Sequence, residues 1–180
     1  MENNHRRERS WWKCVSINID SETLSNESMS PKITCAGWHI PQAWVVEAPA
    51  LPSGVARTPQ TSLEAAELAY TLASTQSRYM DYSSIPLIVH QTWKTMDRNL
   101  WSSNVVQAVG TWLSYCQPAP QSYGTDMAYI IWDDDGMRAF MQKYEPDFLR
   151  VFWTLPSIVE RADVFRVLVL KWFGGIVSFH

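Results

Sequence analysis

The run of residues 158–176, IVERADVFRVLVLKWFGGI, is the densest apolar stretch of the chain and constrains its fold more than any other segment. Its apolar residues recur at spacings of three and four, as expected for one face of a helix: Ala162, Phe165, Val169 and Phe173. Gly174-Gly175 predicts the end of that helix, because glycine adopts the left-handed conformation without steric penalty. Ile176-Val177 then begins like a buried strand. The run therefore predicts a helix that packs on a sheet and leads into one of its strands.

Arg161, Asp163 and Arg166 lie within this apolar run. Asp163 and Arg166 are three residues apart, so they are neighbours on a helix surface and can present a carboxylate and a guanidinium at one place. From the residues alone, two interpretations stay open. The pair is either a binding site or an intrahelical ion pair at the edge of the core.

The first part of the chain has a different character. Residues 1–60 are polar and interrupted by prolines, and they are predicted to form a disordered or irregular tail. Residues 61–78 are predicted to form an isolated helix and a linker, since Thr61 and Glu64 have the spacing of a capping box. The apolar stripe of this helix is expected to lie loosely on the domain or on nothing. The folded domain is predicted over residues 84–180.

The apolar, β-branched segment at residues 85–93 predicts a buried strand. This strand would deliver His90, Gln91 and Thr92 at its carboxyl end, where ligands bind in open α/β sheets. Taken alone, a histidine at a strand end is more often a structural residue whose hydrogen bonds are satisfied. The segment by itself leaves that choice open.

Further elements follow in alternation. Residues 99–116 have the apolar spacing of a helix, and Ala128–Trp132 reads as a second buried strand. Asp133-Asp134-Asp135 contains D-x-D and invites a metal hypothesis, but helical spacing follows at once, so helix capping is favoured. Residues 148–155 are predicted as an aromatic-rich connection. Alternating strands and helices predict an α/β fold with a mainly parallel sheet.

Composition excludes several classes of protein. A net charge of −3 and a pI near 5.8 give no electrostatic argument for nucleic acid. The three cysteines have no metal-site or disulfide spacing. The sequence shows neither a signal peptide nor an apolar run long enough to span a membrane.

Four segments in combination resemble the family 32 glycosyltransferases, which include alpha-1,6-mannosyltransferases and mannosyl inositol phosphorylceramide synthase subunits. They are I-P-L-I-V-H-Q-T-W at 85–93, the D-D helix start at 133–134, R-A-D-V-F-R at 161–166 and G-G-I at 174–176. The resemblance covers roughly the last 95 residues. It implies the N-terminal part of a GT-A (Rossmann-like) nucleotide-sugar fold with an incomplete sheet.

The resemblance also implies roles for particular residues. Nucleotide binding is expected of His90, Gln91, Thr92 and Trp93. Donor-sugar binding is expected of Arg161, Asp163, Arg166, Gly174 and Gly175. No catalytic residue is assigned. The family uses Mn²⁺ (or Mg²⁺) held by a D-x-D motif just after G-G-I, but Phe179 stands where its first aspartate is expected, so those metal ligands are absent from the chain.

The function implied is transfer of a mannosyl or other hexosyl group from a nucleotide sugar, GDP-mannose in the first place, to a glycan or inositol-phosphoceramide acceptor. The implied location is the Golgi or another endomembrane. The missing motif leads us to interpret the chain as a truncated form whose own activity is in question. The alternative is a non-catalytic subunit, which binds nucleotide sugar or pairs with a partner protein.

Overall fold

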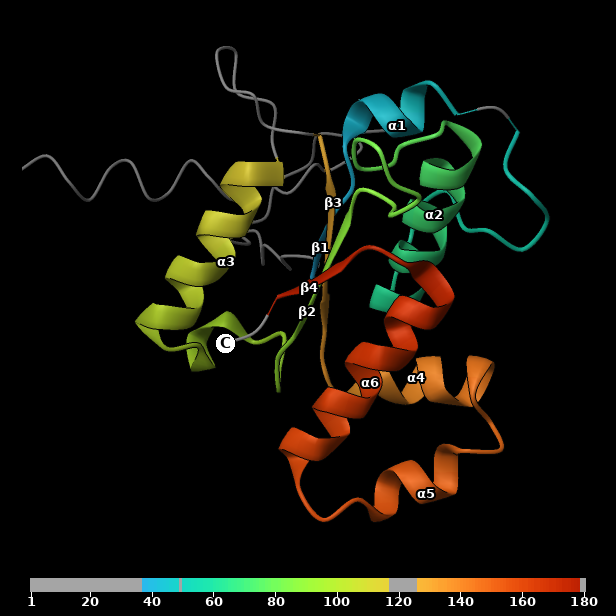
Figure 1. Ribbon diagram of the computed structural model, residues 1–180. Coiled ribbons are helices and arrows are strands. Elements are labelled where there is room, and N and C mark those ends of the chain that lie inside the picture. Colours follow the sequence, from blue (N-terminus) through green and yellow to red (C-terminus); the bar gives the residue numbers. More distant parts are fainter. Residues whose placement is uncertain (1–36, 49, 117–125, 179–180) are drawn as a thin grey trace, which may run out of the picture. The chain divides into compact units, whose positions relative to one another are not determined.

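The protein is built on a four-stranded mixed sheet (Figure 1). The computed structural model describes residues 37–48, 50–116 and 126–178. The strands are β1 (Trp38–His39), β2 (Ile88–Thr92), β3 (Ala128–Trp132) and β4 (Ile176–Ser178), in the order β1-β3-β2-β4. β2 pairs in parallel with both β3 and β4, whereas β1 is antiparallel to β3. The predicted mainly parallel sheet is confirmed.

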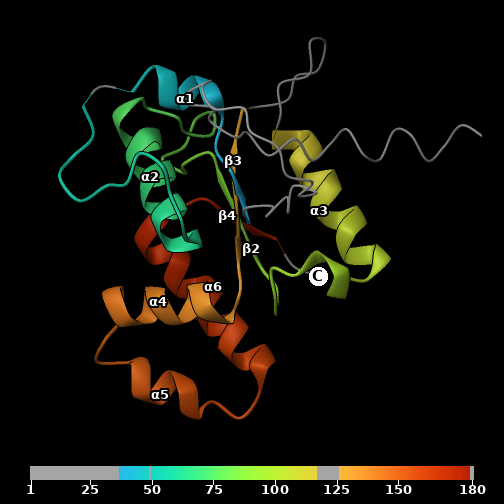
Figure 2. The same ribbon diagram turned by 180° about the vertical axis from the view of Figure 1, so that it is seen from behind.

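Six α-helices and one short 3₁₀ helix are described around this sheet. They are α1 (Gln42–Val46), α2 (Ser62–Thr75), η1 (Arg98–Leu100), α3 (Ser103–Cys116), α4 (Asp134–Tyr144), α5 (Leu149–Thr154) and α6 (Ile158–Phe173). α3 covers one face of the sheet, and α2, α4 and α6 cover the other (Figures 1 and 2). The arrangement is an open, partial sheet between helical layers, which confirms the predicted α/β, Rossmann-like class.

α2 is not an isolated helix, contrary to the sequence-based expectation. Its apolar face is fully covered, and it packs against β2, β3, α4 and α6. The buried residues of this face are Leu63, Ala65, Ala66, Leu68, Ala69, Leu72 and Ala73. Four of them are alanines, which let the helix lie close to the sheet but add little to a hydrophobic pattern. The stripe therefore looked weaker in the sequence than it is in the fold.

Two short elements lie inside the range 1–60 for which an irregular tail was predicted. β1 extends the sheet beyond β3, and the carbonyl of Gly37 accepts a hydrogen bond from the Ile131 amide at 2.6 Å. α1 begins directly after Pro41. A strand of two residues and a helix of five carry too few positions for a periodic signal. The part of that range at residues 1–36 lies outside the described residues.

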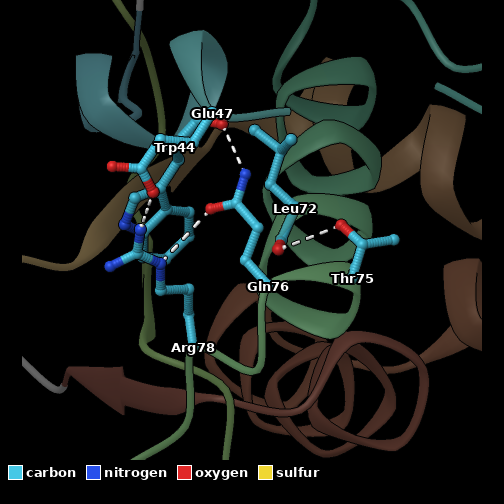
Figure 3. A network of polar contacts seen from close by, with 6 residues as sticks. All are labelled: Trp44, Glu47, Leu72, Thr75, Gln76 and Arg78. Atoms are coloured by element: carbon cyan, nitrogen blue, oxygen red, sulfur yellow. Dashed lines mark hydrogen bonds and ion pairs between the residues drawn. The ribbon is translucent and has the colours of Figure 1, made fainter. Parts of the chain in front are cut away.

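A polar network ties α1 to the end of α2 (Figure 3). The side chain of Gln76 donates from Nε2 to the carbonyl of Trp44 at 2.6 Å. Arg78 donates from Nε to Gln76 Oε1 at 3.2 Å and forms an ion pair with Glu47 at 2.5 Å. Trp44 itself is completely buried. This network holds α1 against the carboxyl end of α2.

Aromatic side chains form the core between the sheet and the α4–α6 layer. Trp132 of β3 is fully buried, and its ring centroid lies 5.9 Å from that of Phe140, 5.2 Å from that of Phe165 and 6.4 Å from that of Phe173. Phe165 and Phe173 are on the predicted apolar face of α6. The contacts of Trp132 with Phe140 and Phe165 are edge-to-face and that with Phe173 is stacked. Aromatic pairs in these arrangements add stability beyond the area they bury.

The start of α4 shows what the aspartate triplet does. Asp133 is the N-cap, and its Oδ1 accepts a hydrogen bond from the Gly136 amide at 2.9 Å. Asp134 and Asp135 occupy the first turn, where negative charge meets the positive end of the helix dipole. The capping interpretation is confirmed.

The segment at residues 148–155, predicted as an aromatic-rich connection, contains the short helix α5.

The turn from α6 into β4 requires both of its glycines. α6 begins with a complete capping box between Ser157 and Glu160 and ends at Gly174. Gly174 has φ 63° and ψ −150°, which is a glycine-only region rather than the left-handed helical conformation predicted from the sequence. At Gly175, with φ +85°, a Cβ atom would lie 2.4 Å from the carbonyl oxygen of Ile88.

His90 of β2 sits at the centre of a hydrogen-bond chain through the core. Its Nδ1 accepts from the indole Nε1–H of Trp132 at 3.2 Å, and its Nε2 lies 3.1 Å from the carbonyl of Gly174. The carbonyl can only accept, so the ring is neutral with its proton on Nε2. Burial lowers the pKa of His90 to about 4. The chain joins β3, β2 and the α6–β4 turn.

Replacing Gly175 with alanine is expected to destabilise the fold by about 2 kcal/mol or more, because the positive φ and the close Ile88 carbonyl both oppose a side chain. Gly110→Ala is the matched control, since nothing lies within 4 Å of a Cβ atom there, and it should stabilise α3 by about 0.5–1 kcal/mol. Urea unfolding measures both. Equal midpoints for Gly175→Ala and the wild type would contradict this description of the turn.

His90 predicts a pH-dependent stability. Its pKa is lower in the folded chain, about 4, than the ordinary value of 6.5 expected when unfolded, so the unfolded state binds more protons between these values. Stability is complete above pH 6.5 and falls by about 3 kcal/mol as the pH drops towards 4. Burial also lowers the pKa of His39, which adds to the fall with the same sign.

The contribution of His90 is isolated by comparison with His90→Gln. This variant is expected to be less stable at pH 7 but to lose less stability between pH 6.5 and 4. The measurement is the free energy of unfolding by urea at several pH values. Parallel pH profiles for the two proteins would show that His90 does not titrate as described.

Candidate functional site

Three of the predicted site residues converge at the carboxyl edge of the sheet. Arg166 of α6 donates from NH2 to the Thr92 hydroxyl at the end of β2, at 3.2 Å. Its NH1 forms an ion pair with Asp163 Oδ1 at 2.5 Å, as the spacing of three residues predicts. Segments 74 residues apart in sequence are thereby joined.

Arg166 and Asp163 differ in their exposure to solvent. The Arg166 side chain is 16% exposed, whereas that of Asp163 is 58% exposed. The guanidinium is thus largely covered and is held by Thr92 and Asp163, whereas the carboxylate of Asp163 stays open to solvent. An ionised carboxylate accepts hydrogen bonds from hydroxyl groups, and a guanidinium donates to phosphate or sugar oxygens. The arrangement suits a polar, hydroxyl-rich or anionic ligand.

The topology of the sheet places this cluster at a switch point. The connection from β2 to β3 runs through α3 on one face, and the connection from β3 to β4 runs through α4, α5 and α6 on the other (Figure 1). β3 and β4 lie on opposite sides of β2. Ligands of open α/β sheets bind beyond the carboxyl ends of strands at such reversals. Thr92 is the last residue of β2.

The other residues expected to bind a nucleotide point in different directions. Successive side chains of a strand alternate between faces, so His90 and Thr92 share the α6 face while Gln91 lies on the α3 face. His90 is buried with both ring nitrogens engaged. This is the arrangement of a structural histidine, and a role at a nucleotide stays a prediction.

Gln91 and Trp93 each have one buried hydrogen-bond donor without a partner among the described residues. Gln91 is completely buried, and its Oε1 accepts a hydrogen bond from the Tyr129 hydroxyl. Its Nε2 has no hydrogen-bond partner within the described segments, and neither has the buried indole Nε1 of Trp93. Buried donors of this kind are rare in folded proteins. Their part in nucleotide binding stays a prediction.

Arg161, Gly174 and Gly175 lie away from the Thr92–Asp163–Arg166 cluster. α6 runs back along the sheet, so its terminal glycines approach Pro86 and Ile88 near the amino end of β2. Arg161 instead stacks near Trp153 of α5, with its guanidinium carbon 5.4 Å from the ring centroid. A role for these three residues in donor binding stays a prediction, while the structure gives each a packing role.

The described residues do not fit a divalent cation. Among residues 37–48, 50–116 and 126–178, no three histidine, cysteine, aspartate or glutamate side chains are grouped to hold one. Asp133 is committed to the α4 cap. Burial raises the pKa of the Cys116 thiol to about 12, so it stays protonated and is a poor ligand at neutral pH.

A further contact joins α4 and α5. The sequence did not single out Arg138 or Trp153, which meet across α4 and α5 with the Arg138 guanidinium carbon 4.4 Å from the ring centroid. They are 15 residues apart on separate helices, so no local spacing signals the contact. Among the described residues, none of the helices has the length and apolar character needed to span a bilayer.

Comparison with known proteins finds similarity to yeast proteins named as inositol phosphoceramide mannosyltransferases and mannosyl phosphorylinositol ceramide synthases. The chain is 37% identical over 95 residues to "Inositol phosphoceramide mannosyltransferase 3" of Schizosaccharomyces pombe, covering 52% of this chain and 23% of that protein. It is 36% identical over 91 residues to "Inositol phosphoceramide mannosyltransferase 2" of the same yeast, covering 51% and 23%. With "Mannosyl phosphorylinositol ceramide synthase CSH1" of Saccharomyces cerevisiae, identity is 33% over 92 residues, covering 51% and 22%.

The chain thus spans less than a quarter of the length of these three relatives. No protein-family model matches it, and no solved structure does. Over about half of its length, the chain is similar to inositol phosphoceramide mannosyltransferases and mannosyl phosphorylinositol ceramide synthases, which confirms the resemblance predicted from its motifs.

Proposed function

We propose that the chain carries the donor-binding part of a glycosyltransferase. The donor would be a nucleotide sugar, GDP-mannose in the first place, and the acceptor the headgroup of inositol phosphoceramide. The observation that supports it most is the meeting of Thr92, Asp163 and Arg166 at the carboxyl edge of the sheet. The similarity to named mannosyltransferases supports the choice of sugar and acceptor.

The chemistry of transfer suits these side chains. The bond between the mannosyl anomeric carbon and the β-phosphate oxygen breaks, and a new bond forms to an acceptor hydroxyl oxygen, whose proton is released. Negative charge grows on the departing nucleoside diphosphate. A guanidinium that is already positioned stabilises such charge without reorganisation, and this is the role proposed for Arg166.

Asp163 and Thr92 would orient the donor. The exposed carboxylate of Asp163 can accept hydrogen bonds from two sugar hydroxyls. Thr92 holds the guanidinium of Arg166 and offers a hydroxyl at the strand end. The family resemblance implies that a divalent cation neutralises the diphosphate, but the described residues provide no ligand set for it. A Golgi or other endomembrane location belongs to the same proposal.

Asp163→Asn is the direct test. It removes a charge from an exposed position, so the free energy of unfolding should stay within about 1 kcal/mol of the wild type. Charge-assisted hydrogen bonds to the sugar would be lost, so GDP-mannose should bind about 10- to 100-fold more weakly. Isothermal titration calorimetry of the full chain, with Mn²⁺ present and absent, measures the affinity.

Asp81→Asn is the matched control, because Asp81 is exposed and precedes the amino end of β2. It should leave both stability and affinity unchanged. If Asp163→Asn bound GDP-mannose as tightly as the wild type, the Asp163–Arg166 pair would be only an intrahelical ion pair. A wild-type chain with no measurable affinity for GDP-mannose would contradict the proposed function itself.

A further inference from the structure

Helix α3 is weakly attached to the sheet. Among its residues whose side chains the structure describes, only Val105, Val109 and Cys116 are buried. Its first turn has no acidic residue and its last turn no basic one, so side-chain charge compensates neither end of the helix dipole. Gly110 lies in the middle of the helix, where glycine is less favourable than alanine because it loses more backbone freedom on folding.

The face of the sheet that α3 covers contains buried nitrogens without partners. Thr92 contacts α6, so Gln91 points to the opposite, α3 face and there accepts a hydrogen bond from the Tyr129 hydroxyl. His39 is the cross-strand partner of Tyr129 and therefore shares that face. Among the described residues, Gln91 Nε2 and His39 Nε2 are both buried and have no hydrogen-bond partner. Such groups oppose burial, because water satisfies them when they are exposed.

The last residue of α3 lies over this polar cluster. Burial raises the pKa of the Tyr129 phenol, and the nearby Cys116 thiol adds to the rise. The His39 ring lies beside the backbone of Cys116. Cys116 is completely buried, so a reagent in solution reaches its thiol only when this part of α3 separates from the sheet.

α3 begins near the candidate donor site. Residues 93–102 join Thr92, the last residue of β2, to Ser103, the first residue of α3. Within this connection Trp101 donates from Nε1 to the Thr95 carbonyl at 2.8 Å. In both views α3 starts at the carboxyl edge of the sheet and runs back along it (Figures 1 and 2). A movement of α3 therefore changes the side of this edge that faces away from α6.

We propose that α3 is a cover that opens and closes as a local unit, and that a sugar donor bound at the carboxyl edge holds it closed. The open state hydrates Gln91 and His39, and it gives up the burial of only a few apolar side chains, so opening costs less than global unfolding. A ligand shifts this equilibrium only if it binds the closed state more tightly. An oxygen-rich donor does so by accepting a hydrogen bond from Gln91 Nε2. The coupling to the donor, but not the opening itself, rests on the proposed function.

The Cys116 thiol measures the opening directly. In the full-length Cys14→Ser/Cys35→Ser variant it is the one remaining thiol, and its reaction with Ellman's reagent is followed by absorbance. The rate is expected to be at least about tenfold above that set by global unfolding, and nearly independent of urea below the unfolding transition, because a local opening exposes little surface. A rate that equals the one set by global unfolding, with the full urea dependence, would overturn the local unit.

Two variants in this background assign the opening to α3. Gly110→Ala favours the helix and should slow Cys116 labelling about two- to fivefold. Gln91→Leu/Tyr129→Phe replaces the hydrogen-bonded pair and the unpartnered amide by apolar groups of similar shape, which should also slow labelling. Ser74→Ala is the control, because it raises the helix propensity at an exposed position of α2 and should leave the rate unchanged. Unchanged rates in both α3-face variants would overturn the assignment.

GDP-mannose tests the coupling. A saturating concentration should slow Cys116 labelling about tenfold, and the slowing should be smaller in Gln91→Leu/Tyr129→Phe. If calorimetry shows GDP-mannose binding while the labelling rate stays the same, the donor does not hold α3 closed, and the proposed function is unaffected. If labelling is local but GDP-mannose does not bind, the proposed function and the role of the donor fail together, and the opening of α3 stands.

Discussion

The hydrogen-bond chain from Trp132 through His90 to the Gly174 carbonyl is the interaction on which the rest of the structure depends. It crosses the core from β3 through β2 to the end of α6. A buried polar chain of this kind stabilises a fold only when every donor and acceptor in it has a partner. It therefore favours one arrangement of the elements that it joins. The same helix carries Asp163 and Arg166 towards the carboxyl edge of the sheet. That edge is where Arg166 reaches Thr92.

One helix therefore serves several purposes through different faces. Phe165, Val169 and Phe173 build the core, and Asp163 with Arg166 forms the candidate donor site. Arg161 is only two residues from Asp163, but its guanidinium packs near the ring of Trp153 on α5. A motif that reads as a single unit in sequence is thus divided between two places on the surface.

Much of the fold could be predicted from local patterns, and what was missed is non-local. The strand at Ala128–Trp132, the Asp133 cap and the apolar face of α6 follow from periodicity and capping chemistry, which involve neighbours along the chain. The burial of α2 depends on the sheet, and the pairing of β1 depends on β3, so neither shows in local spacing. Among candidate site residues, the Asp163–Arg166 pair was predictable from helix geometry. The contact of Arg166 with Thr92 could not be predicted without the tertiary structure. The same holds for the position of Arg161, which contacts Trp153 and not the Asp163–Arg166 pair.

The most direct test of this account is nuclear magnetic resonance of the isotope-labelled chain during titration with GDP-mannose. A donor site at the carboxyl edge of the sheet predicts shifts of the Thr92 amide, the Asp163 carboxyl carbon and the Arg166 guanidinium, with the ring nitrogens of His90 unchanged. That result would separate a ligand-binding edge from a structural core in one experiment. Shifts centred on the His90 ring, with Thr92 and Arg166 unaffected, would contradict it.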